Sequence, residues 1–433
     1  MSIQPQTTYS EGFVAPGFEP LREAFDRNFA QLGEVGASCA VYVDGELKAD
    51  LWGGLADIVT GERWRADTVG LAYSVTKGAT AILCCLLAGR GELDLDAPVA
   101  RYWPAFASHG KGGVTVRMIL AHQAGLPVLD GRFTRAEILA YGVAARALAS
   151  QKPLWTPGAD FGYHALTYGW LLDEVVRRAT GRTIQDLFSS EIAGPLDLDF
   201  FIGLPDGVEH RVAALVDDPL SGRPAASPDS SLADRIPDPE LRRAIGADRR
   251  APADLSSSLL IRAMTANGAL RTPDADEWNT PSVRRAALPA ANGITNARSV
   301  ARLYASCAGA VDGRRLLDED VITAATAERS AGCDRVTGLE ARFGSGFMLP
   351  SAGVPMLSGS SFGHEGVGGA LGFADRDARV GFGYVQNLLK TEMTGGPDPR
   401  VAGLLAALRD ALGGQGLSGG TGRRKVAAPD ETR

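Results

Sequence analysis

The chain has 433 residues, of which 45% are hydrophobic and 22% are charged, so it is long enough for two to three domains with a sizeable core. This composition excludes a mini-protein, a collagen-like fibre and a mainly disordered chain. Its 44 basic and 51 acidic residues leave a net charge of −7 without a basic stripe, so we expect no nucleic-acid partner.

The cysteines are odd in number and have neither the spacing of a zinc site nor that of a disulfide framework. They are Cys39, Cys84, Cys85, Cys307 and Cys333, which we expect to be buried free thiols. The first residues lack a basic segment followed by an apolar run, and no apolar stretch reaches about 18 residues. We therefore predict a cytoplasmic protein that binds no membrane.

The first part of the chain predicts one helix and a hairpin. Apolar residues recur at helical spacing over residues 19–32, and Gly33 ends the pattern. Two apolar runs, 37–43 and 46–53, flank Asp44-Gly45, which is a strong signal for an antiparallel hairpin.

The middle of the chain is predicted to be mostly helical. A compact apolar helix covers 75–87, and helical periods alternate with loops to about residue 303. Residues 205–288 are rich in Pro, Asp, Ser and Arg and predict long loops with short helices, such as one over 255–266. Asn296 is expected to cap a helix that runs to about Ala308.

Strand patterns return near the end of the chain. They cover residues 343–349, 362–375 and 380–387, and a final amphipathic helix covers 399–412. The order of elements predicts a mixed α/β fold, in which an antiparallel sheet flanked by helices is built from both chain ends around an inserted, mainly helical domain. The expected parts are the first piece of the α/β domain (1–73), the helical domain (74–290), the second piece (291–412) and a disordered tail (413–433).

Ser74-Val75-Thr76-Lys77 is the strongest chemical signal, because it lies where an extended segment meets the apolar helix. Positions i and i+3 share a helix face, so Lys77 would lie beside Ser74, whose oxygen faces the positive end of the helix dipole. A serine needs a base to take its proton, and a partly buried lysine can have its pKa lowered enough to serve. The alternative is a helix cap next to a surface lysine.

Three other patterns are weaker. Ser108-His109-Gly110-Lys111 has the same spacing as Ser74 and Lys77, but no helix is expected after it. Residues 359–363 match the G-x-S-x-G nucleophile elbow around Ser361, yet a strand follows where a helix is required. His364-Glu365 begins like a zinc H-E-x-x-H motif, but position 368 is glycine, so no metal site is predicted.

Several motifs occur together in a fixed order. They are Ser74 to Lys77, His122-Gln123-Ala124-Gly125-Leu126, Trp155-Thr156-Pro157-Gly158, Tyr163, Gly181 and Gly194-Pro195-Leu196. Over about residues 37–387 this set resembles the serine-reactive family of class C β-lactamases, penicillin-binding DD-peptidases and, most closely, family VIII carboxylesterases. The resemblance implies a β-lactamase/DD-peptidase-like fold and a serine hydrolase without a cofactor.

Roles for individual residues follow from the resemblance. Ser74 would be the acylated nucleophile, Lys77 its partner and Tyr163 the proton shuttle to the leaving group. The oxyanion hole would be formed by the N–H groups of Ser74 and Val367. The family's K-T-G strand motif appears here as His364-Glu365-Gly366, so His364 and Gly366 are expected at the substrate.

Two positions depart from the family pattern. Ala165 stands where asparagine is common, and His364 stands where lysine is common. Tyr163 could instead be a core aromatic residue, and His364 merely a residue at a strand edge. A mostly neutral histidine gives up the cation that would bind the carboxylate of a β-lactam or a D-Ala-D-Ala peptide, whereas a neutral ester loses nothing.

We therefore predict a serine carboxylesterase that hydrolyses small acyl esters through an acyl-enzyme. A β-lactamase or DD-peptidase is the alternative, and an acyltransferase of the same family is a further one. A protein of this fold that binds a ligand without catalysing a reaction is a hypothesis from outside the enzymes. The expected partner is a small-molecule ester, and the sequence does not predict the oligomeric state.

Overall fold

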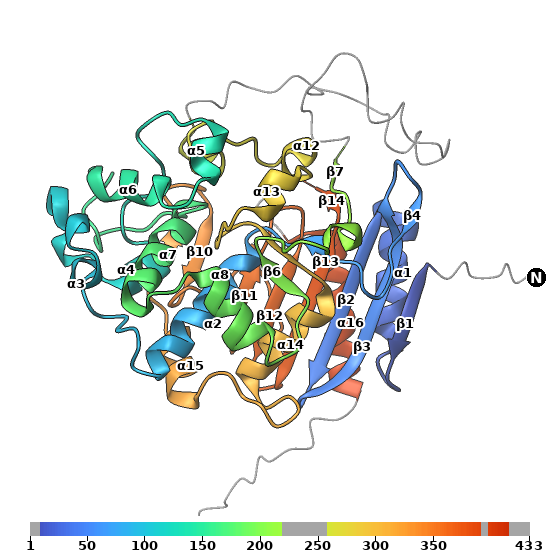
Figure 1. Cartoon of the computed structure of the whole chain (residues 1–433). Helices are drawn as coiled ribbons and strands as arrows, with labels where there is room; N and C mark the ends of the chain where they lie inside the picture. Colours follow the sequence, from blue (N-terminus) through green and yellow to red (C-terminus); the bar gives the residue numbers. More distant parts are fainter. Residues whose placement is uncertain (1–8, 219–257, 391–396, 415–433) are drawn as a thin grey trace, which may run out of the picture.

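The computed structural model describes residues 9–218, 258–390 and 397–414 (Figure 1). A seven-stranded antiparallel sheet combines strands from early and late in the chain, in the order β1-β3-β2-β13-β12-β11, with β4 beside β3. Its strands are β1 (Ser10–Val14), β2 (Gly36–Val43), β3 (Glu46–Asp57), β4 (Glu62–Arg63), β11 (Ser361–Glu365), β12 (Leu371–Asp375) and β13 (Val380–Gln386). The predicted antiparallel sheet built from both chain ends is confirmed.

The first helix and hairpin form where the sequence predicts them. Helix α1 (Glu19–Leu32) ends at Gly33, whose φ of 67° is in the left-handed region that glycine adopts without strain. Strands β2 and β3 are joined by Asp44 and Gly45, with φ values of 52° and 79°, as a two-residue hairpin turn requires.

Helices cover both faces of the sheet. On one face, α1 and α16 (Pro399–Gly414) pack together over apolar side chains of β2, β12 and β13. On the other face, α14 (Ala297–Ala308) lies against β2, β12 and β13, and α2 (Val75–Gly89) lies against β11. Asn296 caps α14, with its side-chain oxygen accepting a hydrogen bond from the Ser299 N–H at 2.8 Å, as predicted.

Mostly short helices lie in the chain between the early strands (β1 to β4) and the late strands (β11 to β13) of the large sheet. Figure 1 shows α3 to α7 gathered to one side of this sheet. They are α3 (Val99–Tyr102), η1 (Pro104–Gly113), α4 (Val116–Leu120), α5 (Arg135–Leu139), α6 (Val143–Ser150), α7 (Thr167–Thr180), α8 (Ile184–Leu187), η2 (Phe188–Ala193), η3 (Glu209–Arg211), α11 (Leu259–Met264), α12 (Ala275–Trp278) and α13 (Pro281–Arg285), with α15 (Glu319–Thr326) after α14. Small strands accompany them: β5 (Gly70–Leu71), β6 (Phe200–Ile202), β7 (Val216–Asp217), β8 (Gly293–Thr295), β9 (Ser330–Cys333), β10 (Glu340–Phe343) and β14 (Leu388–Leu389).

Some predicted strands have different limits. The pattern over 362–375 is two strands, because the glycine-rich segment 366–370 turns the chain between β11 and β12. Of the predicted strand 343–349, only Phe343 belongs to a strand, β10, and the rest continues irregularly to an isolated bridge between Met348 and Gly363. Strand β1 is missed in the sequence, because three of its five residues are exposed and its alternation is weak.

Other expectations fall partly outside the described residues. Helix α11 lies within the predicted 255–266, of which residues 255–257 are not described. Helix α16 continues to Gly414, two residues beyond the predicted end, and residues 415–433 of the predicted tail lie outside the description. Four cysteines are buried, but Cys333 is exposed, which corrects the expectation for that thiol. The domain boundaries at residues 73 and 290 remain predictions.

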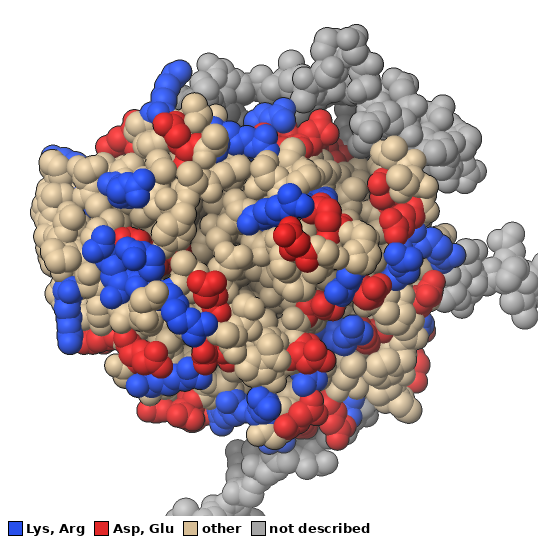
Figure 2. Space-filling view, in the orientation of Figure 1, with Lys and Arg blue, Asp and Glu red and all other residues tan. Residues whose placement is uncertain are grey.

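Basic and acidic side chains are interspersed on the face that Figure 2 shows, without a continuous basic stripe. Within the described residues, no helix has the length and apolar character needed to cross a membrane. Nor do three or more His, Cys, Asp or Glu side chains gather there as a metal site would require.

Candidate functional site

Ser74 stands immediately before the first turn of α2. The residue before it, Tyr73, has a φ of 44°, which is a strained conformation for a side chain of this size. The Tyr73 ring packs on Trp278 of α12, with ring centroids 4.9 Å apart, and only 2% of the residue is exposed. Packing therefore holds a sharp turn that presents Ser74 at the start of the helix.

Lys77 lies one helical turn after Ser74, and its Nζ is 3.0 Å from the Ser74 Oγ. The same nitrogen donates a hydrogen bond to the Ala290 carbonyl oxygen at 2.9 Å. Lys77 is fully buried, and this burial lowers the pKa of its ammonium well below the usual value. Burial therefore favours the neutral amine, which can accept the hydroxyl proton of Ser74.

The helix that carries this pair is held deep in the protein. Every residue of α2 from Val75 to Cys85 is buried, and the helix lies between β11 and the short helices. Gly78 allows the close packing, because a side-chain carbon there would be 1.9 Å from the Tyr304 hydroxyl oxygen. The Ala290 carbonyl was not identified in the sequence, since no local motif shows that the segment before β8 reaches Lys77.

Tyr163 reaches the same place from the loop before α7. Its ring lies 4.7 Å from the Lys77 Nζ, and its hydroxyl group is hydrogen-bonded with Ser74. Burial raises the pKa of the Tyr163 phenol, while the hydrogen bond with Ser74 opposes that rise. The phenol is therefore protonated at neutral pH and can donate a proton only when another group replaces it.

Two histidines hold the loop that carries Tyr163. The His122 ring packs against Tyr163, with centroids 5.0 Å apart, and its Nδ1 accepts a hydrogen bond from the His164 N–H at 3.1 Å. The His164 ring donates through Nδ1 to the Gly162 carbonyl oxygen at 2.6 Å and accepts through Nε2 from the Leu126 N–H at 3.0 Å. The sequence singled out His122 only as part of a motif, and the structure gives it this supporting place.

His364 lies on β11 against α2. Its ring centroid is 6.1 Å from that of Tyr163, and its Nδ1 donates to the Glu365 carbonyl oxygen at 2.7 Å. The residue is 1% exposed; burial, followed by the nearby Lys77, lowers the pKa of the imidazole to about 3. His364 is thus a neutral group whose Nε2 has no hydrogen-bond partner among the described residues.

The segment after β11 passes close to the chain before Ser74. A side-chain carbon on Gly366 would be 2.3 Å from the Ala72 carbonyl oxygen, so only glycine allows this approach. The Gly366 N–H donates a hydrogen bond to the Ala370 carbonyl oxygen, within the turn. The Gly363 N–H donates to the Met348 carbonyl oxygen. Val367 follows in the turn, two residues beyond the end of β11.

The N–H groups of Ser74 and Val367 donate no hydrogen bond within the part of the chain that the structure describes. Backbone donors of this kind are otherwise almost always paired in folded proteins, so two free ones on adjacent segments can receive an anionic oxygen. Ser74, Lys77, Tyr163, His364 and Gly366 are thus brought to one place. Val367 follows directly in the chain.

The rival serines have different surroundings. The Ser361 hydroxyl donates to the Asp375 carboxylate at 2.6 Å and lies on a strand, so it lacks both a base of the histidine type and an elbow. Ser108 donates its hydroxyl hydrogen to the Ala149 carbonyl oxygen at 2.7 Å, and the Lys111 Nζ lies 3.5 Å from its Oγ. Neither serine has the arrangement of Ser74.

Comparison with known proteins assigns the family. The family model described as Beta-lactamase matches residues 25–407. The chain belongs to the beta-lactamase family. Its mixed α/β architecture, with an antiparallel sheet flanked by helices, is the fold shared by β-lactamases and penicillin-binding proteins.

The proteins that resemble this chain include some named as esterases and some named as beta-lactamases or penicillin-binding proteins. The esterase/beta-lactamase LipL of Mycobacterium tuberculosis is 34% identical over 409 residues, which are 92% of this chain and 88% of that protein. The crystal structure of a family VIII carboxylesterase is 35% identical, with a TM-score of 0.78 over 93% of this chain and 99% of that one. A penicillin-binding protein homolog from Caulobacter crescentus is also 35% identical, with a TM-score of 0.74 over the same shares.

Proposed function

We propose that the protein is a serine carboxylesterase that hydrolyses small acyl esters through an acyl-enzyme on Ser74. The observation that carries the proposal is the 3.0 Å contact between the Ser74 Oγ and a fully buried Lys77 Nζ. A neutral amine at this distance is a base for the hydroxyl, whereas an ammonium held by an ion pair would not be.

In the acylation step, the Ser74 Oγ forms a bond to the ester carbonyl carbon and its proton passes to the Lys77 amine. The carbonyl oxygen becomes an oxyanion, for which the N–H groups of Ser74 and Val367 are the donors. Backbone donors aimed at developing charge in such a site each contribute about a hundredfold to a thousandfold in rate.

Collapse of this intermediate breaks the bond between the carbonyl carbon and the alcohol oxygen. Tyr163 gives its hydroxyl proton to the departing alkoxide and regains a proton from the Lys77 ammonium, so the protons balance. Water then attacks the acyl carbon, with the neutral Lys77 again accepting a proton. The bond between the acyl carbon and the Ser74 Oγ breaks, the Lys77 ammonium returns the proton to the Ser74 oxygen, and the acid product leaves. Tyr163 suits this relay because its ring lies 4.7 Å from the Lys77 Nζ.

The site favours neutral substrates. His364 is buried and neutral, so it offers no positive charge to a substrate carboxylate. An ion pair at about 4 Å is worth roughly 4 kcal/mol at an effective dielectric of 20, before desolvation costs, and that contribution is missing here. Relatives named as esterases and a carboxylesterase neighbour support the same choice.

A β-lactamase or DD-peptidase is the second candidate, because one relative is named an esterase/beta-lactamase and one structural neighbour a penicillin-binding protein homolog. It requires efficient turnover of a penicillin, which the ester proposal does not. Acyl transfer to an alcohol or amine instead of water is the remaining alternative and would yield a new ester or amide. We also propose a cytoplasmic location, which fractionation of producing cells tests.

Labelling with a fluorophosphonate tests the nucleophile. We expect one adduct by intact mass, mapped to Ser74, and no adduct in a Ser74→Ala variant. Ser108→Ala is the matched control, since it removes the other serine that has a lysine three residues on, and it should label normally. An adduct on Ser108 or Ser361, or no adduct in the wild-type protein, would contradict the proposal.

A further inference from the structure

The turn between β11 and β12 contains three glycines within four residues, Gly366, Gly368 and Gly369. Gly368 and Gly369 have φ values of 83° and 101°, which side-chain-bearing residues rarely adopt. Such a sequence has large conformational freedom in isolation. The turn nevertheless carries Val367, whose N–H must lie within a few tenths of an ångström of one position to serve an oxyanion.

Two buried side chains hold this turn from outside. Both the Gln386 Nε2 and the Arg400 Nη2 donate hydrogen bonds to the Gly368 carbonyl oxygen, the latter at 2.5 Å. Gln386 is the last residue of β13, and Arg400 is in the first turn of α16. The Gly368 carbonyl, directly after Val367, is thereby fixed to a central strand and to a helix.

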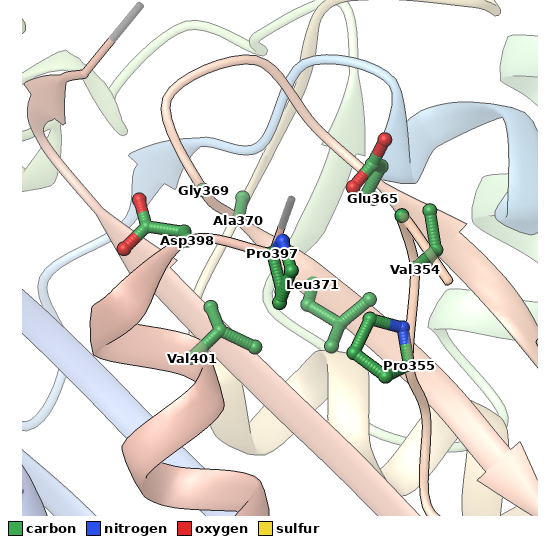
Figure 3. Close-up of a pocket in the computed structure, with 10 residues that line it drawn as sticks. Val354, Pro355, Glu365, Gly369, Ala370, Leu371, Pro397, Asp398 and Val401 are labelled. Atoms are coloured by element: carbon green, nitrogen blue, oxygen red, sulfur yellow. The ribbon is translucent and has the colours of Figure 1, made fainter. Parts of the chain in front are cut away.

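Arg400 is itself fixed by carboxylates. Its Nη1 lies 3.1 and 3.2 Å from the two Glu34 oxygens, and its Nη2 lies 2.6 Å from the Asp398 Oδ2. The Tyr384 hydroxyl donates to Glu34 from the other side. Figure 3 shows Asp398 beside Gly369 and Ala370 of the turn, with Glu365 across the crevice that they line.

The cluster of Arg400, Glu34 and Asp398 costs more free energy than a purely structural role requires. The Arg400 and Glu34 side chains have no exposed surface, and burying charges costs several kcal/mol per ion before their attraction compensates. Apolar residues of similar volume are often at least as stable in such places. A requirement to hold one carbonyl oxygen in one position accounts for the polar choice.

We propose that Gln386 and Arg400 are positioning residues that hold the Gly368 carbonyl and thereby set the Val367 N–H as an oxyanion donor. The inference rests on the proposed function, because it needs an oxyanion to be formed at Ser74. Both residues would act through the Gly368 carbonyl and not by contact with the substrate. Their effect is on the transition state and not on binding of the ester.

The test compares a p-nitrophenyl ester with its thiono analogue, in which sulfur replaces the carbonyl oxygen. A sulfur anion accepts hydrogen bonds poorly, so the rate ratio of the oxo to the thiono ester reports the oxyanion hole. Gln386→Met is the main variant. The Gln386 Oε1 has no hydrogen-bond partner among the described residues, so methionine removes one bond and one unsatisfied acceptor, and the fold should persist.

We expect Gln386→Met to lower kcat by about tenfold with KM within about twofold, and to lower the oxo/thiono ratio by a similar factor. Arg400→Lys should do the same, because Glu34 is bonded by one guanidinium nitrogen and Asp398 and Gly368 by another, and a single compact ammonium does not span both positions. Tyr384→Phe is the matched control: it removes a bond to Glu34 but none to Gly368, so it should lower Tm and leave the ratio unchanged.

The two proposals fail in different ways. Loss of active protein lowers both rates equally and cannot change the ratio, so an unchanged ratio and kcat in Gln386→Met would overturn the positioning role alone. A ratio that falls equally in Tyr384→Phe would also overturn it. A wild-type enzyme that does not prefer the oxo ester would overturn both the positioning role and the oxyanion assignment.

Discussion

Lys77 is the side chain whose environment matters most for the chemistry. It is buried, has no carboxylate partner among the residues that the structure describes, and forms hydrogen bonds with the Ser74 hydroxyl and the Ala290 carbonyl. Lys111 is also buried and also lies near a serine, but its Nζ bonds the Gln151 carbonyl, and the Ser108 hydroxyl donates its hydrogen to the Ala149 carbonyl oxygen. The difference lies in the surroundings and not in the spacing.

Lys77→Arg should be as damaging to kcat as Lys77→Ala, although it keeps the charge. Arginine does not give up its proton at any working pH, and its planar head does not fit the ammonium site. The measurement is kcat on a p-nitrophenyl ester, with circular dichroism to check folding. If Lys77→Arg kept more than about a tenth of wild-type kcat, the activation barrier would have changed by less than roughly 1.4 kcal/mol. Lys77 would then contribute only the electric field of its positive charge and would not be the base.

His364 sets the expected choice between neutral and anionic substrates. The wild-type enzyme should hydrolyse short-chain p-nitrophenyl esters readily and benzylpenicillin poorly, because the neutral His364 offers no positive charge to the carboxylate. His364→Lys should raise kcat/KM for benzylpenicillin relative to the ester, although burial beside Lys77 will limit the gain. Equal efficiency of the wild-type enzyme on both substrates, measured at moderate salt, would favour the β-lactamase alternative.

At the scale of elements, the close approach of the segment after β11 to the chain before Ser74 is expected to position the two oxyanion donors. Gly366→Ala would place a carbon 2.3 Å from the Ala72 carbonyl oxygen, so the two segments must separate. We expect a loss of kcat of about tenfold or more, since displaced donors no longer match the oxyanion.

Gly359→Ala is the control for this change. It stands just before β11, and a side-chain carbon there meets nothing within 4 Å. It should leave kcat within about twofold. Equal kcat values for Gly366→Ala and the wild-type enzyme would show that the close approach has no part in catalysis.

Elements with a strong local signal could be predicted from the sequence. The helix over 19–32 and the turn at Asp44-Gly45 depend on neighbouring residues, and both are confirmed. The strand prediction over 362–375 overlooked the local turn signal of Gly366, Gly368 and Gly369. The contacts of this turn with Ala72, Gln386 and Arg400 could not be predicted, because those residues are distant in sequence. The same reason hid the Ala290 carbonyl and the supporting place of His164.

At the scale of the whole molecule, three buried histidines link stability to pH. Burial lowers the pKa of His122 well below 6.5, that of His164 to about 4 and that of His364 to about 3. Below pH 6.5 these histidines therefore bind protons in the unfolded chain but not in the folded protein. The free energy of unfolding consequently falls as the pH falls. Glu365 opposes this, because limited hydration and the Asp398 charge raise its pKa to about 7.

The free energy of unfolding should consequently decrease between pH 6.5 and 5. Three imidazoles against one carboxyl give a limiting slope of up to about 2.7 kcal/mol per pH unit. Urea unfolding at pH 7, 6 and 5 measures it. His364→Asn removes one titrating group and should flatten the curve, whereas a wild-type stability that is constant or higher at pH 5 would contradict the account.

The arrangement of the whole chain determines which groups surround each serine. Sheet strands from both ends of the described chain bring Gly366 and Val367 to a helix that begins some 290 residues earlier in the sequence. The family resemblance anticipated this meeting. Periodicity and spacing alone did not, because they are local.

Hydrolysis of a short-chain p-nitrophenyl ester by Ser74→Ala, beside Ser361→Ala, is the most direct test of this account. Both variants should fold, as checked by Tm. We predict that Ser74→Ala loses about a thousandfold or more in kcat, while Ser361→Ala, which loses only its bond to Asp375, keeps nearly all of it. Near wild-type hydrolysis by Ser74→Ala, or a thousandfold loss in a folded Ser361→Ala, would contradict the assignment of Ser74 as the nucleophile.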